Sequence, residues 1–249
     1  MALYLKGFLI AAKGIPMTVL VSLFALVLGV AFGLLLALIR TSKIKILKAI
    51  SSIYVEIVRG TPMIVQALVM AYGLPYLLQS HSVEFRWSNL IIPAMLVCGL
   101  NSAAYMAEVI RGGLQAVDAG QIEAAQSLGM TKGQIMKLVV LPQAIKIVIP
   151  SFGNEFVTMI KETAVLSYVG VVEVLRSAQL WNAATYNTFE AYIGAAAVYL
   201  CLTFPLSKLI GLLEKRMNKG SKSVSGGKSV SGPKNSSDAK SPAKEAAAI

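Results

Sequence analysis

The stretch LVSLFALVLGVAFGLLLALI, residues 20–39, contains no charged residue. A helix of about 20 apolar residues, rising about 1.5 Å per residue, crosses roughly 30 Å of hydrocarbon. Around this stretch, 56% of the chain is hydrophobic and only 14% is charged, whereas soluble domains carry about 25% charged residues. The mean hydropathy is +0.68. We therefore predict an all-α polytopic membrane protein.

Four further apolar stretches bring the prediction to about five transmembrane helices. The predicted spans are residues 16–40, 61–78, 89–109, 144–161 and 191–213. Pro150 is expected to interrupt the fourth span, because proline removes a helical hydrogen bond. Residues 163–174 are apolar but too few to cross, so we expect a re-entrant or surface helix there.

Positive charges in the short loops predict the orientation. The loop between the first two predicted spans contains these cations: Arg40, Lys43, Lys45, Lys48 and Arg59. The next loop contains only His81, Glu84 and Arg86 as ionisable residues. Lysine and arginine concentrate on the cytoplasmic side. We therefore expect the first loop, the long loop 111–142 and the C-terminus in the cytoplasm, and the N-terminus outside.

The composition changes near Asn218 to Ser, Gly, Lys, Ala and Pro. We predict a membrane domain over residues 1–217 and a disordered cytoplasmic tail over 218–249. The tail triplet Gly227-Lys228-Ser229 ends like a phosphate-binding loop, but Lys222 stands where that loop requires glycine. We therefore expect no ATP site, and no other cofactor, in this chain. The net charge of +11 lies in loops and tail, which argues against nucleic-acid binding.

The long loop 111–142 reads as two capped helices. Asp118 is a typical N-cap with Gln121 at the third helical position, and Gly129 is a typical C-terminal residue. Thr131 is expected to cap a second helix, which Pro142 would close.

Ile122, Ala125 and Leu128 are spaced to form one apolar face of the first short helix. Such a face, projecting from the membrane, can dock in a groove of a partner protein. Alternatively, the helix lies on the lipid headgroups. The residue pattern alone leaves both interpretations open.

The same loop resembles a known family. The order Glu123-Ala124-Ala125, Gly129 and Leu141-Pro142 is similar to the cytoplasmic signature loop of permease subunits of ATP-binding-cassette (ABC) importers, although Val139 replaces a frequent isoleucine. Four flanking segments resemble the subfamily for glutamine, histidine and arginine: EIVRGTP (56–62), NSAAY (101–105), IRGG (110–113) and GNEF (153–156). The resemblance covers roughly residues 7 to 215.

The resemblance implies a type I importer-like complex in the bacterial cytoplasmic (inner) membrane. Its parts are two permease subunits (two copies, or one copy and a paralogue), two ATPase subunits holding ATP and Mg, and an extracytoplasmic binding protein. The chain itself would hydrolyse no ATP. The substrate would be a polar or cationic amino acid such as arginine, lysine, histidine or glutamine. The resemblance assigns ATPase coupling to Gln121, Glu123, Ala124, Ala125, Leu128 and Gly129.

Polar side chains within the spans are costly and indicate function. Asn101 and Glu155 lie about 14 and 16 Å deep by helical rise, near the membrane midplane. Glu155 would attract a cationic group. The predicted substrate-binding residues are Asn101, Tyr105, Asn154, Glu155, Thr158 and Thr163. The alternative is that these groups only hydrogen-bond one helix to another.

Two residues are predicted as structural or gate elements. Glu108 lies closer to the cytoplasm and is expected to pair with Arg111 or Arg59, and Arg59 precedes the helix start at Pro62. No metal site is expected, because the only histidine is in a loop. The rival interpretations are a proton-coupled secondary transporter or channel that uses membrane carboxylates, and a structural subunit without a transport path.

Overall fold

The computed structural model describes residues 1–42 and 44–222, and within them every regular element is a helix. Five helical segments of this part are long and apolar enough to cross a membrane: Ile15–Arg40, Met63–Ser80, Ile91–Gln115, Lys132–Val169 and Thr188–Met217. They overlap all five predicted spans. The all-helical, five-span prediction is confirmed, and the fourth segment is much longer than expected.

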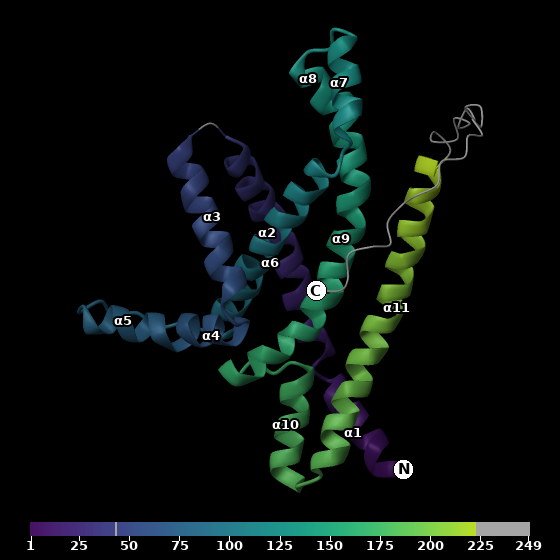
Figure 1. The fold of residues 1–249 in the computed structure, drawn as a ribbon. Coiled ribbons are helices and arrows are strands. Elements are labelled where there is room, and N and C mark those ends of the chain that lie inside the picture. Colours follow the sequence, from purple (N-terminus) through teal and green to yellow (C-terminus); the bar gives the residue numbers. More distant parts are fainter. Residues whose placement is uncertain (43, 223–249) are drawn as a thin grey trace, which may run out of the picture.

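The helices are arranged in a bundle with an extension at one end and an arm at one side (Figure 1). Their bounds are α1 Ala2–Ala12, α2 Ile15–Thr41, α3 Lys45–Gly60, α4 Met63–Leu68, α5 Leu74–Ser80, α6 Ile91–Gln115, α7 Ala119–Ser127, α8 Lys132–Ile135, α9 Leu141–Glu162, α10 Val174–Thr185 and α11 Thr188–Lys222. π-Helical turns at Val69–Gly73 and Met136–Val140 join α4 to α5 and α8 to α9, and a 3-10 helix, Thr163–Val169, follows α9.

The packing of α2 against α6 forms the centre of the bundle. Val21 and Ala25 of α2 are buried with Val97 and Cys98 of α6 in one apolar cluster. The two helices approach closely at Gly29, where an added Cβ would lie 2.4 Å from the Ser102 hydroxyl oxygen. Small residues permit such close contact between membrane helices.

A second cluster joins α1, α10 and the start of α11 at the end of the molecule opposite α7 (Figure 1). It contains Ala11, Val174, Ala178, Trp181 and Ala191. Neither α1 nor α10 was predicted, because both are shorter than a membrane span.

The predictions for two prolines are wrong: Pro142 does not end a helix, and Pro150 does not interrupt one. Residues 132–162 form one continuous helical rod, in which Pro142 lies in the first turn of α9. A proline is tolerated in a first turn, where its missing N–H costs little, and the preceding π-helical turn shifts the hydrogen-bond pattern there. Pro150 is buried inside α9, which continues past it to Glu162.

The predicted loop after the first span is largely the amphipathic helix α3. It packs through Ser51 and Val55 against α2 and α6. Its charged residues are the reason that it was not predicted as a membrane span. After the break at residues 60–62, α4 and α5 extend sideways from the bundle (Figure 1). At the other end of the chain, α11 continues past Asn218 to Lys222, and the rest of the predicted tail lies outside the described residues.

Candidate functional site

Two side chains satisfy backbone carbonyls at the break between α3 and α4: the Thr61 hydroxyl, which donates to Ile57 at 2.8 Å, and the Gln66 amide. Thr61 and Pro62 have extended backbone there, which leaves carbonyl groups without helical partners. The Gln66 side-chain nitrogen donates to the carbonyls of Val58 (2.8 Å) and Thr61 (3.1 Å) and to the Thr61 hydroxyl (2.8 Å). Backbone groups inside a membrane need such partners. Gln66 therefore stabilises a discontinuous helix, the usual setting for transporter sites.

Asn101, a predicted substrate residue on α6, contacts this break. It is 3% exposed, and its Nδ2 donates to Gln66 Oε1 at 3.1 Å. Gln66 was missed by the sequence prediction, although its amide inside a span, four residues after Pro62, was a usable signal.

Tyr105 lies one helical turn after Asn101, and Arg59 covers it. The Arg59 guanidinium carbon is 5.3 Å from the centre of the Tyr105 ring, a distance typical of cation–π contact. Of the two partners predicted for Glu108, Arg59 forms no ion pair with it among the described residues, where Arg111 and Arg40 are its partners.

Glu108 joins α2 to α6. Its carboxylate accepts hydrogen bonds from Arg40 and from Arg111, the latter through Nε (3.1 Å) and Nη2 (2.6 Å). Arg111 also donates to Gln115 at 2.7 Å. The predicted Glu108–Arg111 pair is confirmed. A half-buried carboxylate between two arginines is a helix-to-helix clamp and has little free capacity for a ligand.

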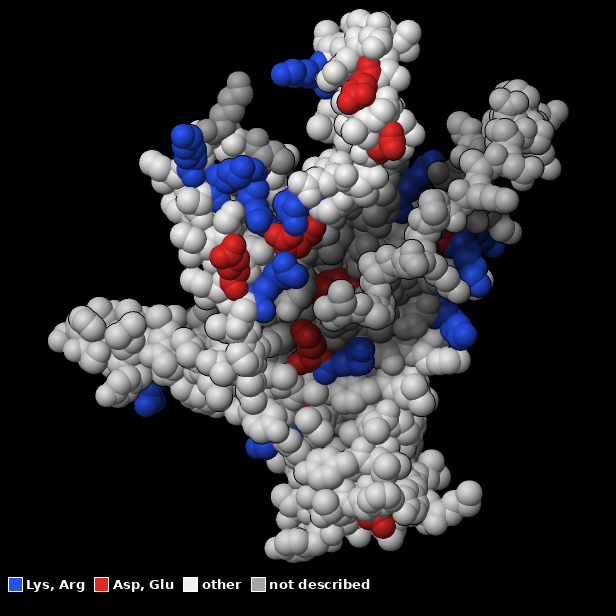
Figure 2. Space-filling view, in the orientation of Figure 1, with Lys and Arg blue, Asp and Glu red and all other residues white. Residues whose placement is uncertain are grey.

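Glu155 on α9 is a carboxylate without an ion-pair partner among the described residues. It is half-buried, lies near the Ser102 hydroxyl of α6 without a hydrogen bond to it, and is close enough to Glu162 for electrostatic interaction. Among the residues that the structure describes, no cationic side chain forms an ion pair with it. Figure 2 shows charged side chains gathered on the hollowed face between α3 and α9. An unpaired carboxylate in the membrane needs a cation, and a substrate can supply it.

The other predicted substrate residues occupy different environments. Asn154 is exposed and Thr158 is half-buried. Thr163 is fully buried, and its hydroxyl donates to the Ile160 carbonyl at 2.8 Å. The structure thus brings Asn101 and Tyr105 to the α3/α4 break and Glu155 to Ser102, the neighbour of Asn101 on α6.

The caps predicted for loop 111–142 are confirmed. Asp118 Oδ1 accepts from the Gln121 N–H at 3.3 Å, and Thr131 forms a reciprocal capping box with Gln134. Gly129 has φ +76, and the N–H groups of Gly129 and Met130 donate to the carbonyls of Gln126 (2.9 Å) and Ala125 (3.2 Å). This is the Schellman pattern, which requires a left-handed residue at the glycine position.

The single apolar face predicted for α7 is wrong. Ala125 is buried in a small core of the loop itself, and Ile122 packs against that core, whereas Leu128 is 82% exposed. Ala125 is therefore buried by residues of the loop itself. The exposed residues of α7 are Ala119, Gly120, Gln121, Glu123, Ala124, Gln126 and Ser127, and the exposed Leu128 follows them at the C-cap. Gln121 accepts from Gln143 of α9 at 2.6 Å, which ties α7 to the helical rod.

Glu173 is a buried group that the sequence prediction missed. It is fully buried at the start of α10, where its carboxylate accepts from the N–H groups of Leu175 (2.9 Å) and Arg176 (2.7 Å) and from the Tyr199 hydroxyl of α11. Burial raises the pKa of the Glu173 carboxyl. Its role is structural, because it joins α10 to α11.

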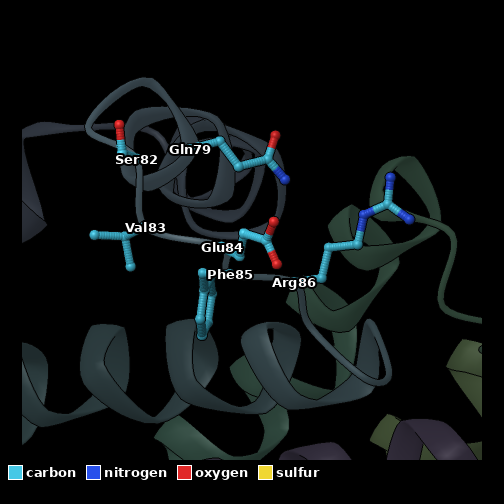
Figure 3. Close-up of a pocket in the computed structure, with 6 residues that line it drawn as sticks. All are labelled: Gln79, Ser82, Val83, Glu84, Phe85 and Arg86. Atoms are coloured by element: carbon cyan, nitrogen blue, oxygen red, sulfur yellow. The ribbon is translucent and has the colours of Figure 1, made fainter.

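A surface pocket lies away from all these residues, at the far end of α5. It has a volume of about 720 Å³ and is lined by Gln79 and residues 82–86. In Figure 3 the polar ends of Gln79, Glu84 and Arg86 point toward one open space, while Phe85 points toward the helix below. None of the predicted site residues lines it.

Comparisons with known proteins agree with one another. Residues 29–219 match the family described as binding-protein-dependent transport system inner membrane component. The putative glutamine transport system permease protein GlnP of Rickettsia prowazekii (strain Madrid E) is 37% identical over 86% of this chain and 95% of its own length. The arginine transport system permease protein ArtQ of Bacillus subtilis (strain 168) is 35% identical over 82% of this chain and 91% of its own length.

Solved structures show the same similarity. An amino acid ABC transporter crystallised with histidines has a chain 40% identical to this one, with a TM-score of 0.78, over 85% of this chain and 96% of that chain. The methionine ABC transporter MetNI in an inward-facing conformation gives a TM-score of 0.53 at 23% identity, over 90% of this chain and 97% of that one. The second match is evidence for the fold alone.

Proposed function

Since this chain belongs to the family of binding-protein-dependent transport system inner membrane components and is the permease subunit of an amino-acid ABC importer, we propose that its substrates are polar amino acids with a preference for cationic ones. The cationic substrates are arginine, lysine and histidine, and glutamine is a weaker substrate. The observation that carries this proposal is the unpaired carboxylate of Glu155.

Three features support the substrate class. Glu155 has no cationic partner among the described residues, so its carboxylate can pair with a cationic group of a substrate. Asn101, Tyr105 and Thr158 lie on α6 and α9, the helices that bring Ser102 and Glu155 near each other, and supply polar groups for the rest of the substrate. Similar proteins are named for glutamine, arginine and nopaline transport.

We propose that α7 is the element that a separate ATPase subunit holds, one on each of two permease subunits. Its exposed face offers the charge of Glu123, the small side chain of Ala124 and the apolar side chain of Leu128. ATP and Mg are bound by the ATPase. Gln121 ties α7 to the helical rod 132–162, which carries Glu155 about 18 Å further along by helical rise from Gln143. A movement of α7 is thus transmitted rigidly to the substrate site.

The other proposed partners complete the importer. A second permease subunit, identical or paralogous, forms the translocation path with this one, and an extracytoplasmic binding protein delivers the amino acid. The proposed orientation has α7 in the cytoplasm with the C-terminus, and the N-terminus outside, as the cationic loops favour.

The substitution Glu155→Gln tests the substrate site. In proteoliposomes containing the complete transporter, we expect the variant to lose arginine and lysine uptake by about tenfold or more relative to glutamine uptake, because a charge-assisted contact is worth about 1.5–3 kcal/mol. Glu214→Gln, an exposed glutamate on α11, is the matched control. An equal loss for all substrates would assign Glu155 to helix packing.

A further inference from the structure

We propose that Gln66 is a positioning residue for substrate choice, because it turns the Asn101 amide so that the Asn101 oxygen faces the substrate. The inference rests on the proposed function, in which Asn101 and Glu155 contact the amino acid. Gln66 lies on α4, and its side chain is hydrogen-bonded at the helix break. It acts on the translocation path only through its hydrogen bond with Asn101.

The hydrogen-bond network determines which way Gln66 points. A backbone carbonyl can only accept a hydrogen bond, and two of them, from Val58 and Thr61, surround one end of the Gln66 side chain. That end must be the amide NH₂. The opposite end, which faces Asn101, is therefore the Gln66 oxygen.

The orientation of Asn101 follows from that of Gln66. An oxygen on Gln66 accepts only from the NH₂ of Asn101, at 3.1 Å, so the Asn101 oxygen must point away from Gln66. This oxygen accepts from no group in the described part of the chain. The Asn101 oxygen is also accessible. Among the described residues, the buried side-chain polar atoms without a hydrogen-bond partner are the hydroxyls of Ser42 and Ser102, and the Asn101 oxygen is not one of them.

The consequence is a site made of acceptors. Asn101 contributes a side-chain oxygen, and Glu155, beside the next residue of α6, contributes a carboxylate. Guanidinium and ammonium groups are donors only, so both oxygens favour them. If Asn101 were turned the other way, its NH₂ would face the same cation and oppose it. Gln66 thus favours cationic substrates without touching them.

A direct binding measurement tests the substrate preference of the permease itself, because no binding protein with its own preference is present. We would measure the Kd values of L-arginine and L-glutamine for the purified transporter complex in nanodiscs. For Gln66→Met, which removes the acceptor that fixes Asn101, we expect the preference for arginine over glutamine to fall about tenfold. Gln79→Met, which changes an exposed amide on α5, should leave the preference unchanged.

A double-mutant cycle separates positioning from a structural role at the break. Aspartate at position 101 presents an oxygen whichever way it turns, so its orientation no longer depends on Gln66. We therefore expect Gln66→Met to change the preference less than about twofold in the Asn101→Asp background. An equal fall in both backgrounds, or no fall in either, would overturn the proposal.

A second variant covers the case in which Gln66→Met does not fold. In Gln66→Glu the carboxyl group must be protonated to donate to the Val58 or Thr61 carbonyl. Its other oxygen still accepts from Asn101. We expect this variant to keep the preference for arginine; loss of that preference in folded Gln66→Glu would contradict the proposal. Failure of the wider function is distinguishable. If Glu155→Gln lowers the preference and Gln66→Met does not, only the role of Gln66 is wrong.

Discussion

Replacing Gly129 by alanine or valine isolates the backbone strain at the end of α7. Gly129 has φ +76, in the left-handed region, and a Cβ added there would meet no atom within 4 Å. The cost is therefore conformational and not steric. A left-handed residue other than glycine costs roughly 1–2 kcal/mol, with β-branched residues at the upper end. The native loop shape should become less favourable by about fivefold for alanine and about thirtyfold for valine.

The assay compares amino-acid uptake with ATP hydrolysis in proteoliposomes that contain the permease, its ATPase and the loaded binding protein. We expect Gly129→Ala to lower the amount of substrate carried per ATP several-fold and Gly129→Val to lower it further. Membrane insertion should be normal, because the loop lies outside the packed spans.

The matched control is Gly133→Ala. Gly133 lies in the same loop, in helix α8, and an added Cβ there also meets nothing within 4 Å. Alanine in a helix is favourable by about 1 kcal/mol over glycine, so coupling should be preserved. Normal coupling in Gly129→Val would refute the assignment of the α7 exit to ATPase coupling. Equal defects at both glycines would refute the argument from backbone conformation.

Two further substitutions test other parts of the account. Glu173→Ala leaves two N–H groups and the Tyr199 hydroxyl without their acceptor; thermal unfolding in detergent should show a loss of about 2–4 kcal/mol, and an unchanged midpoint would contradict a structural role. Leu128→Ala should weaken co-purification of the ATPase about tenfold. The control is Leu138→Ala, which changes another exposed leucine (62%) on the π-helical turn after α8 and should have no effect. Equal effects of the two substitutions would show that Leu128 is not part of the interface.

Features that depend on local sequence were predictable. Five apolar segments appear in composition alone, and the caps at Asp118, Gly129 and Thr131 depend on residues only a few positions away. The exception was Pro142, whose effect depends on the π-helical turn before it, and no simple residue pattern announces such a turn.

Features that depend on packing between distant segments were not predictable. Arg40 pairs with Glu108 across 68 positions, and Asn101 pairs with Gln66 across 35. A residue pattern shows which side chains need partners and not which partners they find. For the same reason the spacing of apolar residues on α7 did not reveal that Ala125 belongs to the loop's own core.

The most direct test of the central claim is ATP hydrolysis by the transporter reconstituted in lipid nanodiscs with its ATPase and binding protein, measured against a panel of amino acids. The account predicts stimulation by binding protein loaded with arginine, lysine or histidine, weaker stimulation with glutamine, and loss of the cationic preference in Glu155→Gln. Stimulation by apolar amino acids alone, or a cationic preference that survives Glu155→Gln, would contradict it.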